Sequence, residues 1–116
     1  GTMLHKAIEV AETLAKEGAE IEIVDLRTLV PLDKETVFKS VKKTNKAVLL
    51  HEDRRTAGIG AEIAALISEE AFEYLDGPLI RITAPDTHVP FSPPLEEAYL
   101  PQTEGILEKT RWLLAY

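Results

Sequence analysis

The sequence predicts an α/β domain in which helices cover both faces of a mainly parallel sheet. Three short apolar segments with strand character, residues 21–25, 47–50 and 79–83, alternate with segments of helical periodicity. Strands separated by helices pair in parallel, and a parallel sheet is covered by helices on both of its faces. A length of 116 residues suits one domain, so we expect residues 1–116 to form a single three-layer α/β/α unit.

The composition is that of an acidic globular protein. Hydrophobic residues make up 45% of the chain, and the formal net charge is -7. This charge argues against nucleic-acid and anionic-membrane partners, which bind basic patches. It suits a partner that presents basic residues, although solubility alone also accounts for it. The absence of cysteine excludes disulfides, thiolate catalysis and cysteine-based zinc sites, and no apolar run approaches membrane-spanning length.

The first helix is expected over about residues 3–17, ending before Gly18. Leu4, Ile8, Ala11 and Ala15 recur at helical spacing, flanked by Ala7 and Leu14, and are predicted to form its inward stripe. Residues 21–25 follow as a strand, because β-branched residues alternate there with glutamates. Asp33 then offers an N-cap oxygen to a second helix over about residues 34–43, which Asn45 can close. A strand that leads into a capped helix is half of a βαβ unit.

The second half of the chain repeats this alternation. Residues 47–50 are an uninterrupted apolar run and read as a strand buried on both faces, followed by a polar loop over residues 51–60. A helix is expected from about residue 60 to 75, with a core stripe of Ile63, Leu66, Ile67, Ala71 and Leu75. After a third strand at 79–83, a proline-rich segment runs to about Pro101 and is expected to wrap the surface without regular structure. The last helix is expected over about residues 103–114, with Ile106, Leu107, Thr110, Leu113 and Leu114 inward.

No complete active site is visible in this pattern. Gly58 and Gly60 begin a dinucleotide-type motif, but Ile63 stands where its third glycine belongs. His51 and Glu52 belong to the densest cluster of titratable groups, and His51 could act as a general base if a partner oriented it. A polar strand end that pairs with neighbouring arginines or with another subunit is the stronger interpretation. We therefore predict no catalytic, cofactor-binding or metal-binding residue in this chain.

Four runs of sequence carry a family resemblance. They are DLRTLVPLD at 25–33, SVKKTNKAVLLHED at 40–53, GIGAEIAALISEEAFEYLDGP at 58–78 and IRITAPDTHVPFSPPLEEAYLP at 80–101. Together they resemble the carboxy-terminal, transketolase-C-like domain of the beta subunit of the thiamine-diphosphate-dependent 2-oxo acid dehydrogenases. The resemblance runs in order through essentially the whole chain.

The resemblance implies a function for the full enzyme. Family members decarboxylate pyruvate or branched-chain 2-oxo acids on thiamine diphosphate with magnesium, and pass the acyl group to a lipoyl acyltransferase. They are usually α2β2 tetramers, so the implied partners are an alpha subunit, a second beta subunit and the acyltransferase. The cofactor contacts lie in parts that this chain lacks, so the chain alone is expected to be inactive. The implied location is the cytoplasm of a prokaryote or the mitochondrial matrix of a eukaryote.

The resemblance also implies that strands are missing from the front of the domain. Family members carry a strand just before the helix that begins near Met3, and Gly1-Thr2-Met3 resembles the tail of that segment. In the family this strand lies centrally, between the strands that match residues 21–25 and 47–50, and an antiparallel edge strand precedes it. We therefore expect the chain to lack its central strand.

Two sets of site residues follow. In the resembled family, the small basic subunit-binding domain of the acyltransferase docks on this domain at an acidic turn residue and at the terminal carboxylate. These correspond to Asp76 and Tyr116 here. We also expect Arg27, His51 and Glu52 to lie at a subunit interface, because they are polar residues at two strand ends. The alternatives are an autonomous protein-binding module, or the same domain of a transketolase or deoxyxylulose-phosphate synthase.

Overall fold

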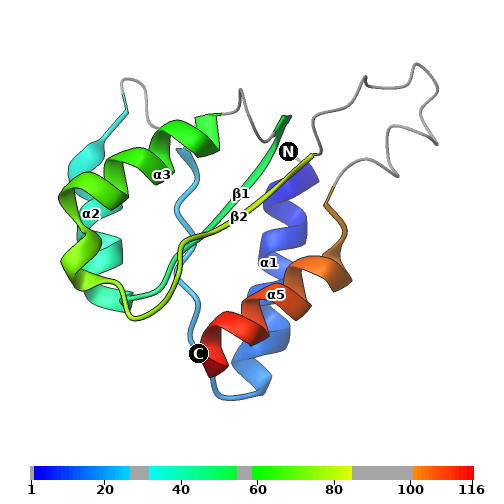
Figure 1. Cartoon of the computed structure of the whole chain (residues 1–116). Helices are drawn as coiled ribbons and strands as arrows, with labels where there is room; N and C mark the ends of the chain where they lie inside the picture. Colours follow the sequence, from blue (N-terminus) through cyan, green and yellow to red (C-terminus); the bar gives the residue numbers. More distant parts are fainter. Residues whose placement is uncertain (1, 27–31, 55–58, 85–100) are drawn as a thin grey trace.

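The structure of the chain, a computed structural model, describes residues 2–26, 32–54, 59–84 and 101–116. In chain order its elements are α1 (Thr2–Lys16), α2 (Lys34–Thr44), β1 (Val48–Arg54), α3 (Ile59–Glu70), the 3-10 turn η2 (Phe72–Tyr74), β2 (Ile80–Ala84) and α5 (Thr103–Ala115) (Figure 1). The proline-rich segment predicted to wrap the surface lies, apart from its last residue, outside the described residues.

A small parallel sheet separates two layers of helices. β1 pairs with β2 in parallel, with Val48 opposite Ile80 and Leu50 opposite Ile82. Helices α2 and α3 lie on one face of the sheet, and α1 and α5 lie on the other (Figure 1). Each face has its own buried cluster: Val10, Leu14, Ile82 and Ile106 on the α1–α5 side, and Val41, Ile63, Ile67 and Ala71 on the α2–α3 side. The predicted three-layer α/β/α arrangement is confirmed.

Both ends of α2 are formed by the residues that the sequence indicated. The backbone N–H of Thr36 donates to Asp33 Oδ1 at 3.1 Å, and the Thr36 hydroxyl donates to Oδ2 at 2.6 Å. These hydrogen bonds lower the pKa of the Asp33 carboxyl. At the other end Asn45 adopts a left-handed backbone with a φ of 65°, and its N–H donates to Val41 O. Asparagine tolerates this conformation better than most residues, which explains why the helix ends there.

The predicted inward stripes of the outer helices need correction. On α1, Ile8 is 39% exposed, whereas the buried side chains are Met3, Lys6, Val10 and Leu14. The face of α1 that packs on α5 and β1 is therefore rotated from the predicted one. Lys6 can be buried because its ammonium group donates to the carbonyl oxygen of Pro101 at 2.9 Å. On α5, Leu114 is 40% exposed although we expected it to face inward.

Residues 21–25 form no strand, which contradicts the prediction. They carry no regular structure, and the sheet of the described residues has two strands, not three. A strand exists only where its backbone groups pair with a neighbour, so β-branched alternation cannot produce one by itself. The segment is nevertheless held in place, because Lys43 Nζ on α2 lies 2.9 Å from Glu22 Oε2.

Two other boundaries differ from the expected ones. β1 runs on to Arg54, through residues that we expected to form a loop, because its pairing resumes with Arg54 opposite Ala84. Helix α3 ends at Glu70, five residues before the expected end, and the chain continues through the 3-10 turn η2. Of the predicted α3 stripe, Ile63, Ile67 and Ala71 are buried, and Leu75 packs partly buried against them.

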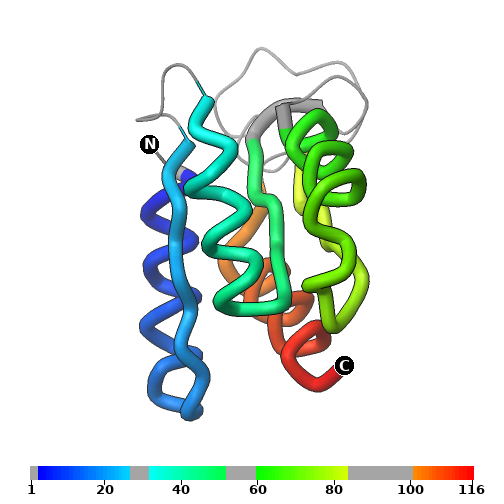
Figure 2. Tube along the Cα trace, turned by 90° about the vertical axis from the view of Figure 1, so that its left-hand side faces the viewer, coloured from blue at the N-terminus to red at the C-terminus, as the bar shows by residue number. Residues whose placement is uncertain are grey.

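An apolar groove lies between residues 20–26 and β1. Its volume is about 640 Å³. Ile21 and Ile23 line one side, Val48 and Leu50 line the other, and helical residues such as Ile67 close it. Figure 2 shows residues 20–26 running alongside α2 and β1. The groove therefore opens beside the edge of β1 that does not pair with β2, where the family resemblance implies a further strand.

Candidate functional site

The turn at residues 75–78 and the end of α5 meet at the end of the molecule where β1 and β2 begin. A Cβ atom placed on Gly77 would lie 3.1 Å from Leu113 Cδ1 and 3.3 Å from Tyr116 Cδ1. Contacts that short leave little room for any residue but glycine at this position. Asp76 is exposed and immediately precedes Gly77. The structure thus brings together the elements that carry Asp76 and Tyr116, the two residues predicted to form a docking site.

A set of long-range hydrogen bonds holds this end together. The Asn45 side chain donates to Tyr74 O at 2.8 Å, and the backbone N–H of Asp76 donates to Asn45 O at 2.7 Å. The next residue, Lys46, donates from its Nζ to Leu113 O at 2.9 Å. A cation is favourable there because the carboxyl end of a helix carries a partial negative charge. The end of α2, the turn after η2 and the end of α5 are therefore fixed to one another.

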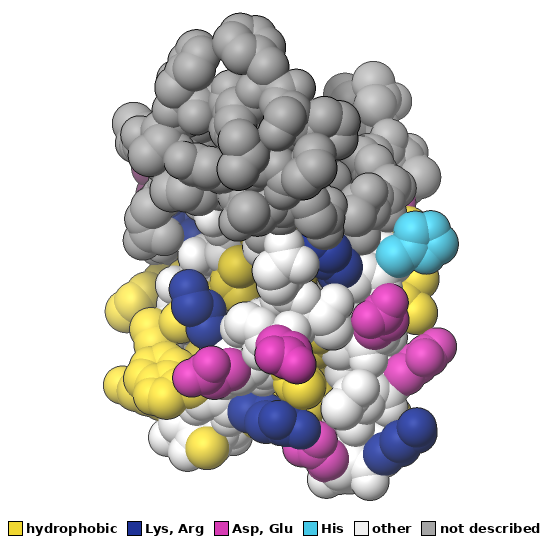
Figure 3. All heavy atoms as spheres, turned by 90° about the vertical axis from the view of Figure 1, so that its right-hand side faces the viewer, with side chains coloured by type: hydrophobic (Ala, Val, Ile, Leu, Met, Phe, Trp, Pro, Cys, Tyr) yellow, Lys and Arg dark blue, Asp and Glu magenta, His cyan; other side chains and the backbone are white. Residues whose placement is uncertain are grey.

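Two exposed aromatic side chains lie at the end of α5, and the ring of Tyr116 lies against Gly77, the residue after Asp76. The rings of Trp112 and Tyr116 have their centroids 5.5 Å apart, and the two residues are 53% and 68% exposed. Figure 3 shows apolar side chains gathered among acidic and basic ones on the side of the molecule that carries α1 and α5. Tyrosine and tryptophan are enriched in the energetically important parts of protein interfaces. An exposed carboxylate beside an aromatic pair is suited to binding an arginine or lysine side chain. We refer to Asp76, Trp112 and Tyr116 as the docking surface.

Sequence reasoning missed the residues that build this surface. Asn45 was expected only to close α2, and Lys46 was assigned no role. Their hydrogen bonds join residues that are 29 and 67 positions apart in the chain, so no local sequence pattern predicts them. The spacing of Trp112 and Tyr116, however, places them one turn apart on the same face of a helix. That spacing was a usable signal for an aromatic pair.

The residues predicted for a subunit interface are described only in part. His51 lies in β1 and is half-buried, with its Cβ 3.8 Å from the point where a Cβ on Gly60 would lie. Arg27 lies outside the described residues, as does the side chain of Glu52. The interface role of these three residues stays a prediction. His51 is the fourth of the seven residues of β1, whereas the turn that carries Asp76 lies beside the end at which β1 begins.

The described residues show no sign of a catalytic or metal centre. They contain no group of three histidine or acidic residues that could hold a metal ion. The hydrogen bonds from Arg111 lower the pKa of Glu17, and those from Lys43 and Ser40 lower the pKa of Glu22. Glu17 and Glu22 are exposed and pair with side chains beside them at the surface, so their pKa shifts reflect surface pairing. Among the described residues, no helix has the length and apolar character that crossing a membrane requires.

The fold and the sequence can now be compared with known proteins. Residues 1–106 match the family described as transketolase, C-terminal domain. The chain belongs to the transketolase C-terminal domain family. A solved structure titled "Split gene transketolase, inactive beta4 tetramer" superposes with a TM-score of 0.80 at 28% identity, covering 99% of this chain and 37% of that one.

Curated relatives within this family are beta subunits. The chain is 45% identical over 109 residues to the mitochondrial pyruvate dehydrogenase E1 component subunit beta of Dictyostelium discoideum, covering 94% of this chain and 31% of that protein. It is 40% identical over 116 residues to the corresponding subunit of Bacillus subtilis, covering 100% and 35%. Acetoin:2,6-dichlorophenolindophenol oxidoreductase subunit beta of B. subtilis is 43% identical over 114 residues, covering 98% and 33%. The chain thus spans about a third of the length of these transketolase-family relatives.

Proposed function

We propose that the chain is the carboxy-terminal assembly and docking domain of the beta subunit of a thiamine-diphosphate-dependent 2-oxo acid dehydrogenase complex. The observation that carries this proposal is similarity at 40–45% identity, over nearly the whole chain, to pyruvate dehydrogenase E1 beta subunits. In this proposal the working enzyme is an α2β2 tetramer that oxidatively decarboxylates pyruvate or a branched-chain 2-oxo acid. It lies in the cytoplasm of a prokaryote or the mitochondrial matrix of a eukaryote.

A second candidate is the same domain in an acetoin-cleaving enzyme. Its support is comparable identity, 43% and 45%, to acetoin oxidoreductase beta subunits from B. subtilis and Cupriavidus necator. Both candidates give this domain the same role, because the relatives that support each of them are beta subunits. Those subunits are some three times as long as the chain. Steady-state assays of the reconstituted complex with pyruvate, branched-chain 2-oxo acids and acetoin distinguish them. A complex that turned over none of these substrates would contradict both candidates.

The described residues do not fit thiamine diphosphate with magnesium. The groove beside β1 has a mainly aliphatic lining, and its three carboxylates, Glu20, Glu22 and Asp25, would repel a diphosphate. A magnesium diphosphate needs carboxylate or carbonyl ligands and donors to its phosphate oxygens. Lys46 lines the groove, but its ammonium group already donates to the carbonyl oxygens of Leu113 and Leu114. In this proposal the cofactor therefore binds to other parts of the enzyme.

Catalytic inactivity of the isolated chain is the first prediction. Titration of the 116-residue chain with thiamine diphosphate and magnesium should give no heat of binding, because an aliphatic groove cannot replace the hydration of a diphosphate. The same chain should show no release of carbon dioxide from pyruvate. The complete beta subunit mixed with its alpha subunit serves as the positive control. Micromolar binding of the cofactor to the isolated chain would overturn this prediction.

The second prediction concerns the docking surface. In this proposal the basic subunit-binding domain of the acyltransferase binds there, with a lysine or arginine against Asp76 and the aromatic pair. Where Tyr116 is the last residue of the protein, its carboxylate adds negative charge at a helix carboxyl end, and extending the chain past it should weaken binding. Replacing Asp76 with lysine should weaken binding on the order of tenfold, since it turns an attraction into a repulsion.

The measurement is calorimetric titration of the intact enzyme with the subunit-binding domain at low and moderate salt. Glu12→Lys is the matched control, because it makes the same change of charge at an exposed position on α1. The loss in Asp76→Lys should shrink as salt is added, since exposed charge pairs are screened. Equal affinities for Asp76→Lys and the control would place the docking site elsewhere.

A further inference from the structure

Two consecutive residues, Asn45 and Lys46, hold the two halves of the docking surface. The carbonyl oxygen of Asn45 accepts the backbone N–H of Asp76 at 2.7 Å, which fixes the acidic half to the end of α2. Lys46 Nζ donates to Leu113 O at 2.9 Å and to Leu114 O at 3.4 Å, which fixes the last turn of α5. That turn carries the aromatic half. The spacing between the Asp76 carboxylate and the aromatic pair is therefore set by one dipeptide.

The last turn of α5 depends on such a contact because its carbonyl groups lack partners within the helix. The last four C=O groups of an α-helix have no intrahelical donor, and such ends open readily unless another group satisfies them. In α5 the backbone N–H of Tyr116 donates to Leu113 O at 3.1 Å. The Lys46 ammonium group donates to the same oxygen, although Lys46 is 67 positions away in the chain. A charged donor makes a stronger hydrogen bond than a neutral one, and the carboxyl end of a helix favours a cation.

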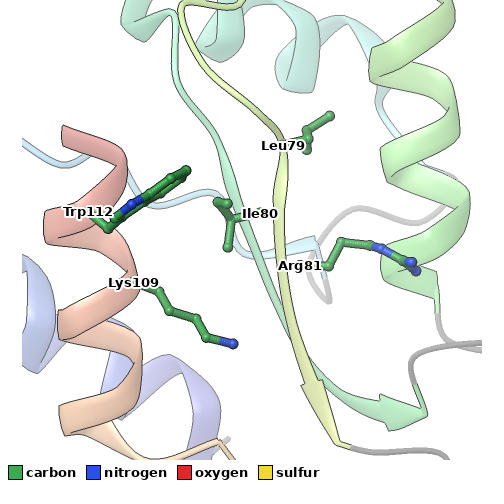
Figure 4. A pocket seen from close by; sticks show the side chains of 5 residues that line it. All are labelled: Leu79, Ile80, Arg81, Lys109 and Trp112. Atoms are coloured by element: carbon green, nitrogen blue, oxygen red, sulfur yellow. The ribbon is translucent and has the colours of Figure 1, made fainter. Parts of the chain in front are cut away.

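The aromatic pair lies along the residues that lead into β2. Tyr116 Cδ1 would lie 3.3 Å from a Cβ atom on Gly77. Trp112 extends from α5 toward β2, where it and Ile80 border a hollow of about 290 Å³ (Figure 4). Both ring positions are set by residues one turn apart on one helix face, so a rotation or loosening of the last turn would displace both rings.

Lys46 does not suit direct contact with a basic partner. By charge alone, a lysine near a surface that attracts lysine or arginine would weaken the binding. Its side chain is half-buried, and its ammonium group is turned onto the carbonyl oxygens of α5. Lys46 and Leu113 line the groove beside β1, whereas none of the three docking-surface residues does. Lys46 therefore reaches α5 from a different side than the one on which the partner would bind.

We propose that Lys46 is the positioning residue of the docking surface, and that it holds Trp112 and Tyr116 in a fixed place relative to Asp76. The inference rests on the proposed docking function and extends it to a residue that the partner does not touch. A surface that is ordered before binding loses less conformational entropy when the partner binds. Removing the Lys46 ammonium group should therefore weaken docking, although its removal makes the chain more acidic.

The first measurement needs no partner. Gly77 has an α proton where the Cβ would stand, so the ring current of Tyr116 should shift the NMR frequency of that proton. In the 116-residue chain Lys46→Met should remove most of this shift, whereas Lys46→Arg, which keeps the cation and its donors, should retain it. Lys16→Met is the matched control, because it removes the same charge from an exposed position on α1, and should leave the shift unchanged. Circular dichroism checks the fold, and Lys46→Gln repeats the test if the methionine variant does not fold.

The second measurement is calorimetric titration of the intact enzyme with the basic subunit-binding domain. Lys46→Met should weaken binding on the order of tenfold, roughly 1.4 kcal/mol, and Lys46→Arg should restore it. Lys16→Met should bind at least as tightly as the wild type, because it adds to the net negative charge. Failure of the wild-type enzyme to bind would contradict the docking function, and the ring-current shift would still decide the role of Lys46. An unchanged shift in Lys46→Met, or an unchanged affinity beside a wild type that binds, would overturn the proposal.

Discussion

Supplying an extended strand to the groove between residues 20–26 and β1 should raise the melting temperature by on the order of 10 °C. The test protein is an extended chain. Its added residues are those that precede the matched region in the beta-subunit relatives. Each valine or isoleucine side chain that the groove buries contributes roughly 1.5–3 kcal/mol, and ordering each residue costs about 1–2 kcal/mol. A strand of about five residues therefore gains a few kcal/mol net, and each kcal/mol shifts the melting temperature by several degrees in a domain of this size.

The groove itself supplies the reason to expect this gain. Ile21, Ile23, Val48 and Leu50 already line it, so the new strand would bury surface on both of its neighbours as well as its own. It would also pair with the edge of β1 that faces away from β2. Residues 21–25 would then have a neighbouring strand, and would become the strand that their sequence predicts.

The measurement is thermal unfolding followed by circular dichroism, with amide hydrogen exchange of residues 21–25 as the local readout. The control is an extension of equal length made of glycine and serine, which adds chain without strand propensity or apolar side chains. Only the extension taken from the relatives should raise the melting temperature and protect the amides of residues 21–25 from exchange. Equal melting temperatures for the two extensions would show that the sheet is completed by another pairing.

Local patterns were sufficient for both ends of α2. The cap at Asp33 and the left-handed residue at Asn45 depend on chemistry within four positions of the chain, so the sequence contains all of it. The strand predicted at residues 21–25 failed for the opposite reason. Its existence depends on a neighbour, and no pattern within the segment reports whether that neighbour is present.

The candidate site shows the same division between local and distant causes. Asp76 and Tyr116 were identified through the family resemblance, and the structure then placed their segments in contact across Gly77. The supporting contacts of Asn45 and Lys46 join distant segments and could not be predicted. The rotation of the buried face of α1 was missed because small apolar residues lie on more than one side of that helix. The buried set includes Lys6, which a hydrophobicity pattern assigns to the surface.

That rotation leads to a prediction with a large effect on stability. Leu14→Ala should lower the free energy of unfolding by about 2–5 kcal/mol, because the side chain is 1% exposed and packs in the cluster with Val10, Ile82 and Ile106. Leu14 does not line the groove, but its neighbours Val10 and Ile106 do, so they can shift toward it and part of the loss is relieved by that rearrangement. Ile8→Ala is the matched control: it shortens an apolar side chain on the same helix, but Ile8 is 39% exposed and its loss should cost under about 1 kcal/mol.

Urea unfolding of the two variants measures the difference in their free energies of unfolding. The slope of that free energy against urea concentration should be the same in both variants. The loss in Leu14→Ala is large compared with the free energy of unfolding of a chain whose groove is open. The substitution is therefore also made in the extended chain, where the added strand should keep the variant folded. There the same difference between the two variants should appear, because Leu14 does not line the groove that the new strand would fill. If both substitutions cost the same, α1 packs through the face that the sequence suggested. The Arg111–Glu17 ion pair, which also joins α5 to the end of α1, would then have to hold the two helices in a different rotation.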